Sequence, residues 1–193
     1  IGLKYNLSKN YIGKGFVVHA KNNLSLQQQK QMKALISQTE FHLEELKKRL
    51  LEDIYPEVHI FVYNNHNEKK LWFGGFYTDI TEVHTPSVHL VLKDGFYPTL
   101  RHELVHALTA DIAFHGLGFH PNMAFTEGLA EALAPSERLL SLDVRSAMIF
   151  SQKRLVDMQE IFSPFFWLRS NTVSYSLSGS FVKYLIDQYG IVS

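Results

Sequence analysis

The stretch His102-Glu103-Leu104-Val105-His106 decides how this chain is interpreted. Its two histidines are four residues apart, so on a helix both imidazoles lie on one face, one turn from each other. Both rings can then reach a single metal ion, while Glu103 between them can face a water molecule on that ion. The stretch therefore predicts a helical metal site in which Glu103 acts as a general base.

The alternative is a surface helix that carries two solvated histidines. Leu100, Leu104 and Leu108 make the segment largely apolar, which indicates a buried helix. Burying a polar group without a partner costs free energy, so two histidines and a glutamate on a buried helix are expected to have binding partners. We therefore favour metal binding.

A site of this kind needs a third ligand further along the chain. One arrangement has a glycine three residues after His106 and a histidine six residues after it. Thr109 and Ile112 stand at those positions, so this arrangement is excluded. The other arrangement is a glutamate on a later helix. Glu127 and Glu131 are four residues apart and share a face. One can be the ligand, and the other can hold a ligand histidine by its second ring nitrogen.

The helix that carries these glutamates has two further expected features. Thr126 is a suitable N-cap. Gly128 and Ala130 are small and would let the helix pack close to the HELVH helix.

HELVH, followed after a 19-residue gap by TEGLAEAL, resembles the gluzincin metallopeptidases, the clan of thermolysin and the zinc aminopeptidases. The similarity is greatest to small bacterial peptidase-MA-like domains, and it extends to the segment from Ser174 to Gly190. The N-terminal part matches only in general layout. The resemblance implies a Zn2+ cofactor held by His102, His106 and Glu127.

The resemblance also implies three further roles. Glu131 stands where thermolysin-like enzymes have an aspartate that orients a ligand histidine. Tyr175 is expected to donate to the oxyanion of a tetrahedral intermediate, the alternative being an ordinary packing tyrosine. His89 is expected to line a cleft, because the strand before the HELVH helix is a substrate-binding sheet edge in gluzincins. A plain core strand is the alternative there.

Three functions follow from these residues. The first is a zinc-dependent peptidase, and we favour an endopeptidase because no Gly-x-Met-Glu-Asn type stretch precedes the site. The second is an inactive peptidase-like module that binds metal and recognises a protein partner, which the presence of Glu103 argues against. The third is a structural zinc domain, but such sites usually have four protein ligands. The substrate would be a peptide or protein.

The composition excludes several other classes. The chain has 193 residues, with 19 Lys plus Arg and 19 Asp plus Glu, which gives no electrostatic argument for nucleic acid or an anionic membrane. The absence of cysteine rules out disulfides, thiolate zinc ligands and a cysteine nucleophile. No apolar run approaches the roughly 20 residues of a membrane-spanning helix.

The remaining sequence predicts a single zincin-like domain of the α+β class. Residues 1–97 are expected to form an αβ half around a small mixed or antiparallel sheet, and residues 98–193 a mostly helical half with the zinc ligands. The predicted strands cover residues 16–20, 58–63, 76–80 and 87–92, and the predicted helices cover residues 24–53, 100–112, 125–133, 139–150 and 175–189.

The ends of the chain indicate a processed or excised piece. The sequence begins with Ile1 rather than Met and stops soon after Tyr189-Gly190, where a helix has just ended. Chains without cysteine occur in the cytosol and outside the bacterial cytoplasm. We favour an extracytoplasmic location, either secreted or membrane-anchored.

Overall fold

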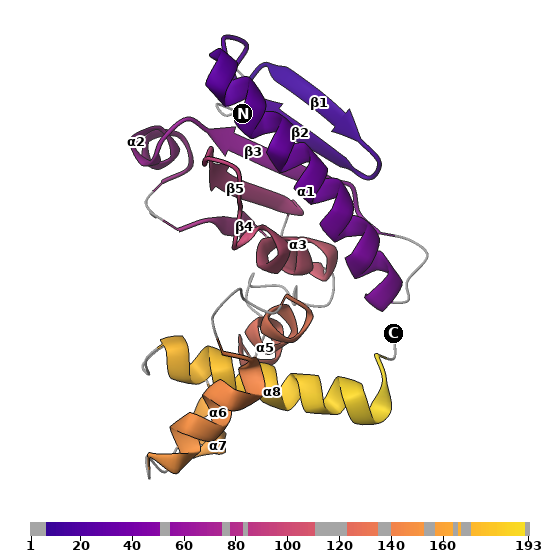
Figure 1. Cartoon of the computed structure of the whole chain (residues 1–193), viewed down its shortest axis with the longest axis vertical. Coiled ribbons are helices and arrows are strands. Elements are labelled where there is room, and N and C mark those ends of the chain that lie inside the picture. The colour runs from indigo at the N-terminus through magenta and orange to yellow at the C-terminus, as the bar shows by residue number, and fades with distance from the viewer. Residues whose placement is uncertain are drawn as a thin grey trace. The chain divides into compact units, whose positions relative to one another are not determined.

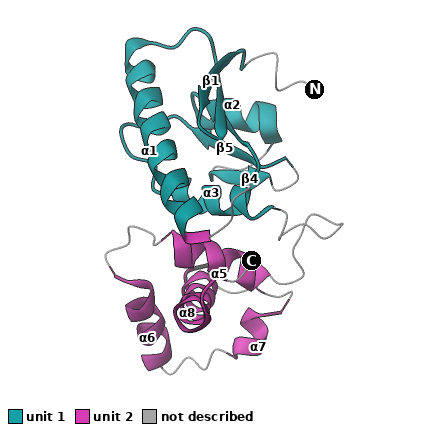
Figure 2. Cartoon of the chain, turned by 90° about the vertical axis from the view of Figure 1, so that its right-hand side faces the viewer, with its two compact units in different colours: residues 1–48, 52–110 teal, residues 49–51, 111–193 magenta. Residues whose placement is uncertain are grey.

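The structure, a computed structural model, is shown in Figure 1. It forms two compact units, residues 1–48 with 52–110 and residues 49–51 with 111–193, which Figure 2 distinguishes by colour. The structure describes residues 7–50, 55–74, 78–82, 85–110, 123–134, 140–152, 157–163, 166 and 171–191.

The first unit is built on a mixed sheet, as predicted, but the sheet has five strands rather than the four that the sequence predicts. The two outer pairs of strands, β1–β2 and β4–β5, are antiparallel, while β2–β3 and β3–β5 are parallel. The order across the sheet is β1 (Lys9–Gly13), β2 (Phe16–Ala20), β3 (Val58–Tyr63), β5 (Ser87–Val91) and β4 (Ile80–Glu82).

The long helix α1 (Leu26–Leu50) lies across one face of this sheet (Figure 1). Side chains alternate between the faces of a strand, so Val18 and Ile60 are buried on the side that α1 covers. From the helix, Leu35 and Leu46 are fully buried as well. We call this side the inner face and the opposite side the outer face.

The outer face is only partly covered. The short helix α2 (His66–Lys69) and the π-helix η2 (Lys70–Gly74) supply Lys69 and Phe73, which pack beside β3 and β5. Over β1 and β2 the outer face stays open, and Ile12 is 83% exposed there.

The helix α3 (Leu100–Leu108) belongs to the first unit because it packs against β3, β4 and β5. The two compact units therefore part near residue 110, whereas the sequence predicts halves that meet at residue 98. The HELVH helix is thus part of the same packed body as the sheet.

The second unit is helical, as predicted. Its main contact joins α5 to α8, and Gly128 is needed there, since a Cβ atom on it would lie 2.8 Å from the Ser178 carbonyl oxygen. The sequence predicted that Gly128 would let its helix pack close to the HELVH helix, but the close approach at Gly128 is made by α8. The helices are α5 (Met123–Leu133), α6 (Leu142–Ser151), α7 (Met158–Ile161) and α8 (Asn171–Tyr189).

Two sequence predictions about these elements are wrong. Thr126 is not an N-cap, because α5 begins at Met123 and Thr126 lies inside its first turn. The strand β5 is not the sheet edge, because β4 pairs with it on its far side. Residues 76 and 77 of the strand predicted over 76–80 fall outside the described residues, and β4 begins only at Ile80.

Within the part of the chain that the structure describes, no helix is both long enough and apolar enough to span a bilayer.

Candidate metal centre

His102 and His106 face each other across one turn of α3, as their spacing predicts. Their Nε2 atoms are 3.1 Å apart, and the ring planes are inclined by 81°. His106 is buried together with Leu104 and Val105, so the helix is not a solvated surface helix. Two ring nitrogens at this separation can bind the same ion.

Glu127 completes a ligand group with these histidines. One ligand atom from each of His102, His106 and Glu127 lies within 4.8 Å of the other two, and among the described residues this is the one group of three or more that could hold a metal ion. Two imidazoles and a carboxylate suit a divalent transition metal and leave a coordination position open for water. The donor set therefore fits Zn2+, although it does not identify the metal.

Glu103 is held by a residue that the sequence did not reveal. The Thr81 hydroxyl, on β4, donates a hydrogen bond to Glu103 Oε2 at 2.7 Å, with the Glu103 carbonyl oxygen as a second acceptor at 2.9 Å. Glu103 is only 8% exposed, so this bond fixes a carboxylate that has few other orientations. No spacing rule links residues 22 positions apart, and a strand pairing was needed to bring them together.

Replacement of Thr81 by valine is expected to lower kcat for peptide hydrolysis by about ten- to a hundredfold, the equivalent of one hydrogen bond to a charged group. KM and the zinc content should stay unchanged, because both hydrogen bonds described for the Thr81 hydroxyl go to Glu103. Thr81→Ser keeps the hydroxyl and should restore most of the rate. Equal losses in the two variants would show that packing at this position matters rather than the hydrogen bond.

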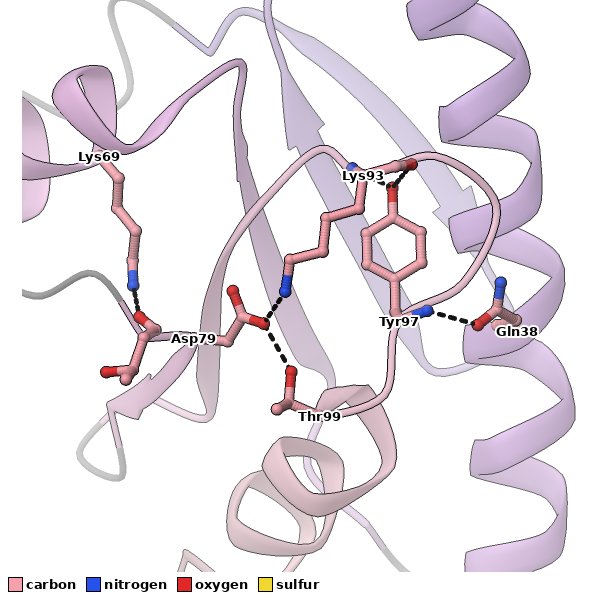
Figure 3. Close-up of polar contacts among 7 residues, drawn as sticks. Gln38, Lys69, Asp79, Lys93, Tyr97 and Thr99 are labelled. Atoms are coloured by element: carbon pink, nitrogen blue, oxygen red, sulfur yellow. Dashed lines mark hydrogen bonds and ion pairs between the residues drawn. The ribbon is translucent and has the colours of Figure 1, made fainter. Parts of the chain in front are cut away.

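A buried carboxylate fixes the start of α3 (Figure 3). Asp79 Oδ2 accepts from Lys93 Nζ at 2.6 Å and from the hydroxyl of Thr99, the N-cap residue of α3, at 2.5 Å. The Tyr97 backbone N–H donates to Gln38 of α1 at 3.1 Å. The segment leading into the HELVH helix is thus tied both to the strand β4 and to α1.

Lys69 lies buried close to this network. Its Nζ donates to the Thr78 carbonyl oxygen (Figure 3). Burial lowers the pKa of Lys69, while the charges of Asp79 and Glu103 act in the opposite direction. Glu103 is therefore influenced by the charge of the Lys69 ammonium group, in addition to its hydrogen bond with the Thr81 hydroxyl.

His89 is a core residue rather than a surface one. It is 1% exposed, its ring stacks on Phe73 with a centroid distance of 3.7 Å, and its Nδ1 lies 3.0 Å from the Tyr63 hydroxyl. Burial, followed by the charge of Lys69, lowers the pKa of His89 to about 3, so the ring is neutral at neutral pH. A role in lining a substrate cleft has no support here, and the alternative of a core strand describes β5 better.

Glu131 pairs with an arginine that the sequence did not single out. Its Oε2 lies 3.4 Å from Arg145 Nη2, and Arg145 Nη1 donates to the Ser176 hydroxyl at 3.1 Å. All of these groups are buried, so the pair links α5, α6 and α8. The predicted role of Glu131 in orienting a ligand histidine stays a prediction.

Tyr175 lies near the start of α8 and is half-buried. Its ring is tilted against Phe166 at a centroid distance of 5.5 Å, and it packs on the apolar cluster around Ile161 and Leu177. These contacts describe the aromatic ring and leave the predicted role of the hydroxyl untested.

Comparison with known proteins adds no assignment. No family model matches the chain, and no curated protein matches its sequence.

Proposed function

We propose that the chain is a zinc-dependent peptidase whose metal is held by His102, His106 and Glu127. The proposal rests on the grouping of these three ligand atoms within 4.8 Å, next to a buried glutamate on the same helix turn. A purely structural metal site would have no use for that glutamate, and it would usually have a fourth protein ligand. The HExxH pattern and the later TEGLAEAL support the same assignment by resemblance.

His102, His106 and Glu127 would hold the metal, which as a Lewis acid would lower the pKa of a bound water molecule towards about 7. Glu103 then takes a proton from the attacking water on a carboxylate oxygen and passes it to the leaving amine. The hydroxyl of Thr81 keeps that carboxylate in one orientation throughout. Tyr175 is proposed to donate its phenolic proton in a hydrogen bond to the developing oxyanion.

The edge strand β4 is the proposed binding surface for an extended peptide. Among the described residues it is the last strand of the sheet and pairs with β5 alone, so its other side would offer main-chain donors and acceptors to a further strand. This assignment replaces β5, which the resemblance suggested as the substrate-binding edge beside the alternative of a plain core strand. Because Thr81 lies on β4, the same strand would align the peptide and hold the general base.

The test is hydrolysis of a mixed peptide library by the chain loaded with one equivalent of zinc. We expect cleavage inside peptides, its loss after a chelator removes the metal, and its return when zinc is restored. Cleavage that survives complete metal removal would refute the proposal. A chain that binds zinc and cleaves no peptide would instead favour the module that recognises a protein partner.

A further inference from the structure

Two histidines meet on the open part of the outer face, well away in sequence from the HELVH helix. His19 lies on β2 and His59 on the neighbouring parallel strand β3. In the register of these strands His19 is opposite Phe61, and His59 is opposite Val17, so the two histidines are diagonal neighbours. His59 is 39% exposed, which leaves the pair accessible from solvent.

The facing nitrogens of the pair are close. His19 Nε2 and His59 Nδ1 are 2.9 Å apart, and the rings are nearly parallel, with an interplanar angle of 18°. Two ligands at right angles on one ion, each bonded at about 2.0 Å, would be about 2.8 Å apart. The separation in this structure therefore suits adjacent positions around one metal ion.

The other nitrogen of each ring faces an oxygen acceptor. Asn10 Oδ1 lies 2.9 Å from His19 Nδ1, and Glu57 Oε1 lies 3.6 Å from His59 Nε2. The two inner nitrogens form one hydrogen bond when one of them carries the ring proton. In the tautomers that carry their protons on the outer nitrogens, both inner nitrogens have lone pairs available to a cation. Metal-binding histidines in proteins usually have this kind of second partner.

We propose that His19 and His59 form a second metal site, selective for a divalent ion that accepts nitrogen ligands at right angles, with Cu2+ as the best match. Copper(II) binds nitrogen ligands most strongly among the first-row divalent ions and prefers tetragonal geometry. Water would fill the remaining positions, since the surface is open. The site is independent of the proposed peptidase centre.

Copper titration of the chain already loaded with one equivalent of zinc tests this site. Calorimetry and electron paramagnetic resonance should show one copper equivalent per chain with nitrogen ligands. Both His19→Gln and His59→Gln should abolish that equivalent, and Asn10→Leu should weaken copper binding about tenfold by removing the oxygen that faces His19 Nδ1. His66→Gln, at an exposed position on α2, is the matched control and should bind copper like the wild type.

Thermal unfolding of each copper-free variant checks that the variant is folded. A lost copper equivalent can then be assigned to the lost ligand rather than to misfolding. The proposal is overturned if wild-type chain takes up no copper beyond the zinc site. It is equally overturned if both histidine variants keep the copper equivalent, because the ligands would then lie elsewhere.

Discussion

Replacement of Glu103 by glutamine is expected to abolish peptide hydrolysis while the chain keeps one zinc ion. The amide has nearly the shape of the carboxylate, but it cannot take a proton from water. General base catalysis contributes about 10²- to 10⁴-fold, so kcat should fall by at least that factor. The measurement is kcat on the best peptide from the library, with the zinc content determined on the same sample.

Glu45→Gln is the matched control for this variant. Glu45 is a partly exposed carboxylate on α1 that lies 3.6 Å from Lys48 Nζ, so its loss should change neither activity nor metal content. Hydrolysis at the wild-type rate by the Glu103 variant would remove this residue from the mechanism. Loss of zinc together with activity would mean that Glu103 has a structural role at the metal.

Replacement of Glu127 by glutamine should have the second largest effect, on zinc affinity. A neutral amide oxygen is a poorer ligand than a carboxylate, and the two imidazoles would remain alone. The loss of zinc affinity should exceed the roughly ten- to hundredfold weakening that follows removal of a group hydrogen-bonded to a metal ligand. Competition with a chelator of known affinity measures it.

Glu131→Gln separates the two glutamates of α5. Glu131 is paired with buried Arg145, so removing its charge should lower the free energy of unfolding by about 3–5 kcal/mol, because a buried ion pair loses one of its charges. Its effect on zinc affinity should be smaller than that of Glu127→Gln. If the Glu131 variant loses zinc and the Glu127 variant keeps it, the ligand assignment within this helix must be reversed.

Local patterns in the sequence predict much of the fold. The strand over residues 58–63 and the two histidines on one face of a helix follow from spacing alone, and both are found in the structure. Helix ends were less accurate. Thr126 has a side chain that suits an N-cap, yet α5 already begins at Met123, so Thr126 lies inside the helix. The type of one residue does not fix where a helix begins.

Features that depend on pairing between distant segments were not predictable. The position of β4 at the sheet edge comes from its antiparallel register with β5, and β4 has only three residues. Thr81 was missed for that reason, since only this register carries its hydroxyl to Glu103. Arg145 was missed because nothing in its local sequence marks it as the partner of Glu131 on another helix.

X-ray absorption spectroscopy of the zinc-loaded wild-type chain tests most directly whether one ion is shared by the two histidines and the glutamate. The expected result is one zinc per chain with two imidazole nitrogens and oxygen ligands at about 2.0–2.2 Å. A chain that binds no zinc, or a zinc shell without the two imidazoles, would contradict the metal centre on which the proposed peptidase depends.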